Sequence, residues 1–397
     1  MLLGGTGGHI TPGLAIGTML KNEGHEVIFI GTEYGMEKDL IPKAGFDLKY
    51  IHASGLVAGI LGKIKAMINL KKGITDCKKI IKEEKPDMCI GTGGYVTAPL
   101  MIAAKQLKIH TLIHESNALP GKTTKLMANK IDEVAVGFEE TKDRLKAKNV
   151  VVTGNPNKMN LNSLTREEAK EIIGINKKLL LIFGGSQGAK KINETIVNII
   201  SQNGFGDYDV IYATGPKNYE EVKNSVLNIK NKEDYEFKDE EDALILEKTN
   251  SNSSLTITTS QNGINKDVAT ISNSSRITIK KFIYNMEEVM KAADLVICRS
   301  GALTCTEIAE VGVASILIPF PYAAENHQFY NAKTLENVGA SEIIEEKILT
   351  TDLLVERING IINNDNLLAS MCENSKKLRK GNPIENIKQE INKILAQ

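Results

Sequence analysis

Two patterns of apolar and polar positions alternate along this chain. Short apolar runs rich in β-branched residues predict strands, first at 27–30, 88–90, 111–113, 134–136 and 150–153. A second series of such runs predicts strands at 179–183, 210–213, 295–298 and 315–318. Between them, helical spacing predicts helices, among others at 12–22, 74–84, 190–201 and 302–311. This alternation is typical of parallel sheets covered by helices on both faces.

The series of strands restarts near 179, after a polar and helix-breaking stretch at 154–165. A chain of 397 residues is too long for one ordinary hydrophobic core, so two domains are expected. We therefore predict an α/β protein with two Rossmann-like domains, at 1–155 and 156–375. The segment 376–397 is expected to be a C-terminal helix that can pack on either domain, including back on the N-terminal one.

One segment lacks the alternating pattern. From 249 to 275, 17 of 27 residues are Ser, Thr or Asn, and the acidic run 238–242 precedes them. Such a composition buries too little apolar surface to offset the entropy lost on ordering. We predict a disordered surface insertion at about 239–275 without a direct function, in which 255–259 is able to form an isolated hairpin strand.

The charges balance, with 49 basic and 49 acidic side chains. This balance argues against nucleic acid as a partner, because such proteins usually carry a basic excess. No run reaches the ~18 apolar residues that span a bilayer, so we expect any membrane contact to be peripheral. The five cysteines are scattered without a Cys-x-x-Cys pair, which favours buried side chains in a reducing compartment.

Four glycine-rich turns, at 4–9, 91–96, 184–189 and 299–304, punctuate the two strand series. Glycine lets backbone amides approach an anion, and the start of a helix adds about half a positive charge. The dinucleotide fingerprint is excluded because Ile10 and Val96 stand where it needs glycine. Ser116 likewise replaces the first glycine of a P-loop. The turns therefore predict phosphate binding of another kind.

Several side chains near these turns are suited to sugar chemistry. His9 stands at the start of the first helix, where an imidazole with a pKa near ~6.5 can take a proton from a hydroxyl. The alternative is a histidine that caps the helix or contacts an anion. Glu115 can act as a base or orient a histidine, and Asn117 can bind a sugar, unless both form a buried, satisfied polar pair. A Glu307 carboxylate can accept both ribose hydroxyls, and the Gln328 amide suits a donor sugar.

No Asp-x-Asp pair stands where a metal ion would bridge a diphosphate. The starts of helices and Lys158 can instead balance the charge of a leaving group. We therefore predict a metal-independent reaction that needs no cofactor.

Segment 59–72 has an apolar stripe edged by lysines, which include Lys65. This stripe fits an interfacial helix on an anionic membrane, and equally a helix that faces the core with solvated lysines. From the residues alone both interpretations stay open. The apolar stripe consists of Ile60, Leu61, Ile64, Met67 and Ile68.

The motifs GGTGGHI-TPG, GTGGYV–P, IHESN, GNP, GGSQGA, CRSGALT–E and AENHQ–NA follow one another in this order. Together they resemble the MurG-type transferases, the undecaprenyldiphospho-muramoylpentapeptide N-acetylglucosaminyltransferases. The resemblance covers nearly the whole chain except about 239–275. It implies a GT-B architecture, in which the parallel sheets of two Rossmann-like domains face a cleft and the C-terminal domain binds most of the donor.

The resemblance also implies an activity. An inverting hexosyltransferase would move N-acetylglucosamine from UDP-GlcNAc to the 4-hydroxyl of the MurNAc-pentapeptide of lipid I, giving lipid II and UDP. This step belongs to peptidoglycan synthesis and cell wall biogenesis, and so to cell shape, cell division and the cell cycle. The expected location is the cytoplasmic face of the bacterial cell membrane, with the apolar stripe on the anionic surface and other cell-wall synthesis proteins as potential partners.

Site residues follow from the same resemblance, position by position. His9 corresponds to the family's candidate base, and Lys158 stands where the family has an arginine. Ile283 corresponds to the residue whose backbone binds uracil, and Glu307 corresponds to the residue that binds the ribose. The positions implied to contact the donor sugar, diphosphate or nucleotide are Thr6, Gly7, Gly8, Asn117, Lys158, Ser186, Gln187, Ile283, Ala302, Leu303, Thr304, Glu307 and Gln328.

This sequence departs from the family pattern at Lys158, which loses bidentate phosphate geometry, and at Ser116, where glutamine is frequent. It also begins three residues before Gly4, so we expect a shortened first strand with lowered stability or activity. Two other functions therefore stay open. One is a UDP-GlcNAc 2-epimerase-like enzyme, which shares architecture and donor, and the other is an inactive nucleotide-sugar binder.

Overall fold

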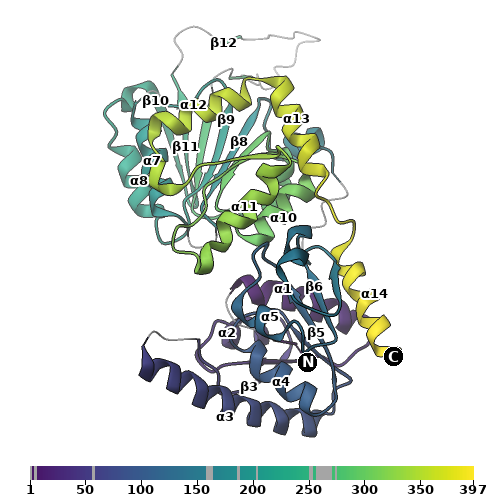
Figure 1. Cartoon of the computed structure of the whole chain (residues 1–397). Coiled ribbons are helices and arrows are strands. Elements are labelled where there is room, and N and C mark those ends of the chain that lie inside the picture. The colour runs from purple at the N-terminus through teal and green to yellow at the C-terminus, as the bar shows by residue number, and fades with distance from the viewer. Residues whose placement is uncertain are drawn as a thin grey trace, which may run out of the picture.

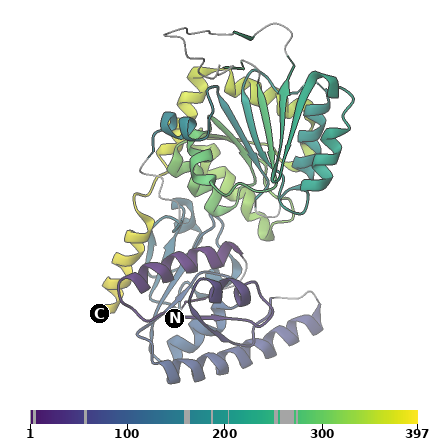
Figure 2. The ribbon, with the colours of Figure 1, turned by 180° about the vertical axis from the view of Figure 1, so that it is seen from behind.

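The protein is described by a computed structural model over residues 2–3, 7–55, 59–157, 164–185, 188–202, 204–249, 254–255, 271–272 and 275–397. Two layered α/β domains lie one above the other (Figures 1 and 2). We call the domain with the strands up to Val150–Val152 the N-terminal domain. The domain with the strands from Leu179–Phe183 onward is the C-terminal domain.

The N-terminal domain contains two parallel sheets. In the first, β1 (Leu2–Leu3), β2 (Ile28–Gly31) and β3 (Asp47–Tyr50) pair in that order. In the second, β4 (Met88–Gly91), β5 (His110–Glu115), β6 (Glu133–Val136) and β7 (Val150–Val152) pair in that order. β1 and β4 are in contact, so the two sheets adjoin. β2, β4 and β6 are buried along their whole length, as expected for parallel strands covered on both faces.

Helices cover both faces of these sheets. They are α1 (Gly7–Asn22), α2 (Glu37–Lys43), α3 (Ile60–Glu84), α4 (Thr97–Gln106), α5 (Lys122–Met127) and the 3-10 helix η1 (Glu139–Arg144). α3 runs along α4 at the outer edge of the domain (Figure 1). No helix in the described ranges has both the length and the apolar character needed to cross a membrane.

The C-terminal domain is built on one eight-stranded sheet. Its strands are β8 (Leu179–Phe183), β9 (Asp209–Ala213), β10 (Tyr235–Glu240), β11 (Ala243–Lys248), β14 (Arg276–Lys280), β15 (Leu295–Cys298), β16 (Ala314–Leu317) and β17 (Ser341–Ile343). The order is β10-β11-β14-β9-β8-β15-β16-β17. The last six strands of this order, from β14 to β17, are parallel to one another. Phe183 pairs with Cys298, and Cys298 with Leu317, so the glycine-rich turns after β8 and β15 leave the same edge of the sheet.

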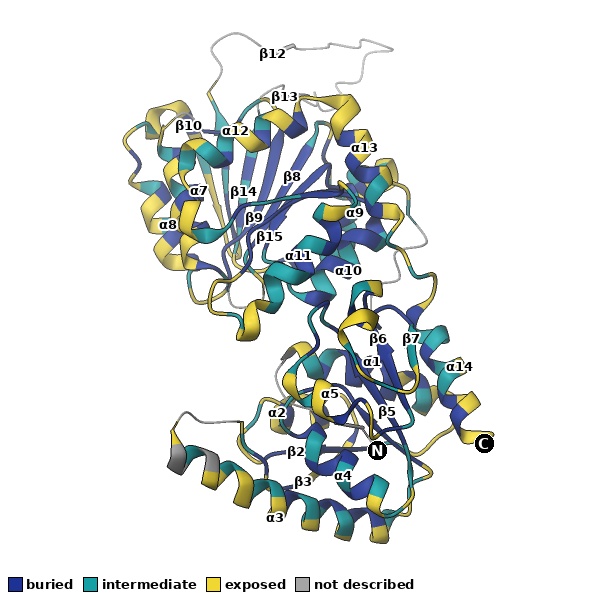
Figure 3. Ribbon diagram, in the orientation of Figure 1, coloured by how far each residue is buried: buried dark blue, intermediate teal, exposed yellow. Residues whose placement is uncertain are grey.

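The helices of this domain lie on both faces of the sheet (Figure 3). They are α6 (Arg166–Ile172), α7 (Lys190–Gln202), α8 (Tyr219–Leu227), α9 (Met286–Ala292), α10 (Ala302–Val311), α11 (His327–Asn337), α12 (Thr351–Ile362) and α13 (Asp365–Lys376). The 3-10 helices are η2 (Lys232–Asp234), η3 (Ala324–Asn326) and η4 (Glu346–Ile348). The two faces bury separate apolar clusters, one around Ile196 and Tyr212, the other around Met290 and Ile308.

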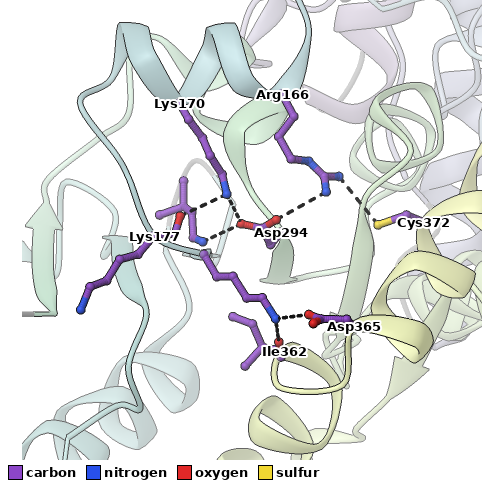
Figure 4. Close-up of polar contacts among 9 residues, drawn as sticks. Arg166, Lys170, Lys177, Asp294, Ile362, Asp365 and Cys372 are labelled. Atoms are coloured by element: carbon purple, nitrogen blue, oxygen red, sulfur yellow. Dashed lines mark hydrogen bonds and ion pairs between the residues drawn. The ribbon is translucent and has the colours of Figure 1, made fainter.

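A buried carboxylate fixes the start of this domain (Figure 4). Asp294 precedes β15 and accepts hydrogen bonds from Lys170 Nζ at 2.6 Å, Arg166 Nη1 at 3.4 Å and the Leu179 amide at 2.8 Å. Two cations on α6 therefore compensate one carboxylate at the edge of β8. A buried charge is tolerated only with such partners.

The structure differs from the expected disorder at about 239–275. Residues 239–240 end β10, and 243–248 form β11, which pairs with β14. Leu244 and Leu246 of β11 are fully buried, so alternate positions of this acidic-flanked segment do reach the core. The expectation is wrong here because the pattern of every second residue outweighs composition. Farther on, β12 (Ser254–Leu255) pairs with β13 (Ile271–Ser272), and positions 256–259 lie outside the described residues.

The end of the chain crosses back to the N-terminal domain. α14 (Pro383–Leu395) packs against α1 (Figure 1). Its residues Ile387, Ile391 and Ile394 are buried there. Asn386 Nδ2 donates to the Thr153 carbonyl at 3.1 Å, beside the connection between the domains. The C-terminal helix is therefore part of the N-terminal core, although the elements before it belong to the other domain.

Candidate active site

A cavity of roughly 760 Å³ lies between the two domains. Its N-terminal wall comes from the start of α1 and the ends of β4 and β5, including His9, Tyr95 and Asn117. Its C-terminal wall comes from the segment 301–304 at the start of α10 and from His327 and Gln328 at the start of α11. These are the carboxyl ends of parallel strands, where α/β proteins bind their ligands.

His9 lies on the N-terminal wall of this cavity. Its Nδ1 lies 2.8 Å from the Thr92 carbonyl oxygen, and since a carbonyl only accepts, Nδ1 carries the proton. The Nε2 nitrogen is therefore the basic one. The ring lies against Gly93 and Gly94, where a Cβ on Gly93 would come within 2.6 Å of Nδ1 and both residues have positive φ. Glycine is needed there for both reasons.

Electrostatics favour a neutral His9 at pH 7. Burial lowers the pKa of its imidazole, while the charge of Glu115 and the hydrogen bond to Thr92 act in the opposite direction. The nearby His327 of the other domain lowers the His9 pKa further. A neutral imidazole with a free Nε2 is able to accept a proton.

The carboxylate of Glu115 accepts four hydrogen bonds from the protein itself. Oε1 accepts from the amide and Nδ2 of Asn117 at 3.0 and 3.2 Å, and Oε2 accepts from the Gly121 amide at 3.0 Å and Thr124 Oγ1 at 2.6 Å. With four donors the carboxylate holds the loop before α5. This geometry favours the alternative of a buried, satisfied pair with Asn117, and the catalytic role of Glu115 stays a prediction.

The C-terminal wall is equally well fixed. Gln328 Oε1 accepts from the Phe320 amide at 2.9 Å, and the Gln328 carbonyl accepts from Ser300 Oγ at 2.8 Å. These bonds fix the amide and leave its Nε2 group for a ligand. Ala302, Leu303 and Thr304 line the cavity beside it.

Two other predicted donor residues lie away from the lining of this cavity. Glu307 stands one turn into α10, where burial raises its pKa to about 7. The Ile283 side chain is buried in the core beside α9, so only its backbone is available to a ligand. Gly8 lines the cavity and Gly7 begins α1. Thr6, Lys158, Ser186 and Gln187 lie outside the described residues.

Sequence reasoning missed the residues that join the two domains. Asn331 of α11 is fully buried, accepts from the Ala118 amide at 2.9 Å, and donates to Asn117 Oδ1 at 3.3 Å and the Ser300 carbonyl at 3.2 Å. Asn155 Nδ2 donates to Thr306 Oγ1 at 2.9 Å and to the Ser116 carbonyl at 3.0 Å. Both asparagines belong to the quoted motifs, AENHQ–NA and GNP, which was the only available signal.

On α3, the described apolar residues of the lysine-edged stripe face away from the core. Ile64, Met67 and Ile68 are 51%, 61% and 50% exposed, and Lys65 is exposed beside them. The core-facing interpretation is therefore wrong for these residues. The side chains of Ile60 and Leu61 lie outside the described part of the chain.

Cysteines and potential metal ligands add no further site. All five cysteines are free and buried, as predicted. Within the described ranges, no three His, Cys, Asp or Glu side chains group as metal ligands would.

Known proteins share these features. The glycosyltransferase family 28 N-terminal domain matches residues 1–136, and the family 28 C-terminal domain matches 179–247 and 238–391. A protein of Acetivibrio thermocellus is 38% identical over 400 residues, with 99% of this chain and 96% of that protein covered. A second relative, from Bacillus cereus, is 35% identical over 99% of this chain and 98% of its own. Both are named UDP-N-acetylglucosamine–N-acetylmuramyl-(pentapeptide) pyrophosphoryl-undecaprenol N-acetylglucosamine transferases.

Solved structures agree with this relationship. The crystal structure of Acinetobacter baumannii MurG matches with a TM-score of 0.76 and 27% identity, and covers 99% of this chain and 98% of that one. A putative UDP-N-acetylglucosamine 2-epimerase of Listeria monocytogenes matches with a TM-score of 0.61 at 12% identity, over 99% and 95% of the chains. The second likeness shows the fold alone. The full-length relatives, the two domain matches and the interdomain site together lead to one conclusion: the chain belongs to glycosyltransferase family 28, among its MurG-type transferases.

Proposed function

We propose that this chain transfers N-acetylglucosamine from UDP-GlcNAc to the 4-hydroxyl of the MurNAc-pentapeptide of undecaprenyl-linked lipid I, which yields lipid II and UDP in peptidoglycan synthesis. The observation that carries the proposal is the position of His9. Its basic Nε2 belongs to one wall of a cavity whose other wall is formed by the starts of α10 and α11.

His9 takes the proton of the acceptor 4-hydroxyl while that oxygen attacks the anomeric carbon of the donor sugar. The bond from this carbon to the β-phosphate oxygen breaks, and its electron pair leaves with UDP. Attack from the face opposite the leaving group inverts the configuration. Glu115 is a positioning residue here, since two of its four hydrogen bonds hold Asn117 against the cavity and the other two hold the loop before α5.

The start of α10 receives the charge of the leaving diphosphate. Its first turn contains no acidic residue, and its unpaired amides add a partial positive charge. Helix ends that favour an anion support a reaction without a metal ion, in which Lys158, Ser186 and Gln187 assist. Glu307 binds the ribose, and the backbone of Ile283 binds the uracil. The donor sugar is bound by Asn117 and Gln328.

The exposed stripe of α3 is proposed to dock on an anionic membrane, at the cytoplasmic face in a bacterial cell. Ile64, Met67 and Ile68 follow one another at helical spacing, and lysines flank them. Interfacial helices bind by burying apolar side chains in the lipid and by attraction of lysines to the anionic headgroups. This stripe has side chains of both kinds.

Incubation with UDP-GlcNAc and a lipid I analogue tests the activity. UDP release that requires the acceptor is expected, unchanged by EDTA. Release of UDP-ManNAc without acceptor would instead identify an epimerase, and a well-folded sample that binds UDP-GlcNAc without turnover would identify a binding protein. Loss of activity in EDTA contradicts the metal-free reaction alone.

A further inference from the structure

His327 is the first residue of α11 and lines the interdomain cavity opposite His9. The two imidazoles are close enough to interact electrostatically across the domain boundary. Among the C-terminal residues that line the described cavity, His327 is the one side chain able to carry positive charge. The reaction described so far does not use this side chain.

The backbone before His327 is strained to bring it there. Glu325 and Asn326 both adopt left-handed conformations, with φ of 53° and 57°, although neither is glycine. Such conformations are energetically unfavourable for residues other than glycine and concentrate at functional sites. Here they turn the chain so that α11 begins at the cavity.

Two helices present their N-termini to this cavity. α10 begins at Ala302 and α11 at His327, and neither has an acidic residue in its first turn. Unpaired amides and helix dipoles of both therefore favour an anion in front of them. A site with one phosphate-binding turn needs only one helix start, and this cavity has two.

The ring of His327 is also fixed. Its Nδ1 lies 2.8 Å from the Ala324 carbonyl oxygen, so Nδ1 carries the proton and donates to it. The Nε2 nitrogen then accepts hydrogen bonds in the neutral ring and donates only when the ring is an imidazolium. A phosphate accepts and never donates, so contact with it selects the cationic form.

We propose that His327 binds the donor diphosphate through Nε2–H as an imidazolium, and so stabilises the phosphate that leaves the sugar. The proposal rests on the proposed function, because it takes a UDP-sugar as the ligand. No proton is transferred in this contact: His9 takes the acceptor proton, and His327 offers a charge-assisted hydrogen bond to the leaving oxygen atoms.

Other ionisable groups face His327 and bear on the pH dependence. His9, Tyr95, Glu115 and Lys122 line the same cavity from the N-terminal domain, and Glu325 lines it from the C-terminal domain. Of these, His9 is the other imidazole among the described lining residues. A variant that lacks only the His327 ring retains His9 and therefore separates the two.

The test compares UDP-GlcNAc with uridine by calorimetry, without acceptor, at pH 6 and pH 8. Both ligands contain the ribose and uracil, so the ratio Kd(uridine)/Kd(UDP-GlcNAc) isolates the diphosphate and sugar. Both phosphates of UDP-GlcNAc are diesters and keep their charge over this range. In the wild type this ratio is expected to be several-fold higher at pH 6 than at pH 8.

In His327→Gln the ratio at pH 6 should fall about tenfold, the size of one charge-assisted hydrogen bond, and lose its pH dependence. Unchanged uridine affinity shows that the variant is folded, and His25→Gln, an exposed histidine outside the cavity, is the matched control and should behave as wild type. Two results overturn the proposal: a ratio in His327→Gln equal to that of the wild type, or a fall that is the same at both pH values, which would mean a sugar contact by the neutral ring. A wild type that does not bind UDP-GlcNAc contradicts the proposed function instead.

Discussion

Asn331 in the C-terminal domain donates from Nδ2 to Oδ1 of Asn117 in the N-terminal domain across 3.3 Å. Asn117 is in turn held by Glu115, and the Asn331 Oδ1 accepts from the Ala118 amide. One buried amide therefore couples the loop after β5 to the start of α11. Arg144 adds a second link, with its guanidinium 4.9 Å from the ring centroid of Tyr330 on the same helix.

Replacement of this amide should uncouple the domains. In Asn331→Ala, the Ala118 amide loses a buried partner, which costs about 1–3 kcal/mol. We expect kcat/KM for the acceptor to fall roughly tenfold, while the Kd of uridine stays within twofold. Steady-state kinetics and calorimetry give these values, and Asn198→Ala, at an exposed position on α7, is the control. A parallel loss of uridine binding would show that Asn331 supports only the C-terminal fold.

Removal of His9 should abolish transfer while donor binding survives. His9→Ala loses the basic Nε2, and a positioned base contributes typically 10²–10⁴-fold, so we expect a loss of that order in kcat. Because burial lowers the His9 pKa, the acid limb of the wild-type pH–rate profile should lie below pH ~6.5. Equal losses of transfer and UDP affinity would mean that the ring shapes the glycine loop around Gly93 instead.

Nucleoside affinity should depend on pH through Glu307. Burial raises its pKa to about 7, and a carboxylate must be ionised to accept both ribose hydroxyls. Uridine should therefore bind roughly tenfold more tightly at pH 8 than at pH 6, with release of a proton below pH 7. Glu307→Gln should bind weakly and without this dependence. A wild-type affinity that is flat from pH 6 to 8 argues against Glu307 as the ribose ligand.

Charge on the α3 stripe should weaken membrane binding without unfolding. Ile64 and Met67 are more than half exposed, so Ile64→Asp with Met67→Asp leaves no cavity in the core. Sedimentation with vesicles that contain anionic lipid should show a loss of at least tenfold in bound protein, given the charge and apolar area removed. Two exposed apolar residues of the C-terminal domain serve as the control, and Ile172→Asp with Leu367→Asp should leave binding intact. Unchanged sedimentation of the stripe variant would rule out this surface.

Stability should fall as pH rises towards 7 because of Glu133. This carboxylate is buried in β6 beneath α14, and burial, with the charge of Glu390, raises its pKa to about 7. The folded protein therefore binds this proton more tightly than the unfolded chain, whose pKa is the ordinary 4.5, and loses stability between these two values. Glu133→Gln should raise Tm at pH 8 and leave it nearly unchanged at pH 4.5. Equal effects at both pH values would assign the change to packing.

Much of the fold follows from local pattern. β8 and β15 coincide with the predicted runs 179–183 and 295–298, because continuous apolar residues between turns mark buried parallel strands. β3 is largely exposed, has no continuous apolar run and was not predicted. β11 has an apolar run at 243–246, but it was not predicted because it stands between an acidic run and a segment rich in Ser, Thr and Asn. α3 joins the predicted helix at 74–84 to the segment 59–72, which was expected to be helical in both interpretations.

The candidate site was likewise predictable from the sequence only in part. His9 and the segment 301–304 stand at helix starts after strands, so the rule about carboxyl ends brings them to one cavity. For Glu115 the sequence left a base and a buried pair with Asn117 both open, because the choice depends on four donors whose positions only the folded loop determines. Asn155 and Thr306 lie 151 positions apart, and no local pattern encodes that hydrogen bond.

The crossing of α14 limits how this protein can be divided. A fragment that ends near residue 155 would lack Ile387, Ile391 and Ile394 and would expose the apolar surface of α1 that they cover. A complementary fragment would carry the same three isoleucines on an unsupported amphipathic helix. Neither half is then a natural unit for expression, but the two fragments mixed in solution should recognise each other through this helix.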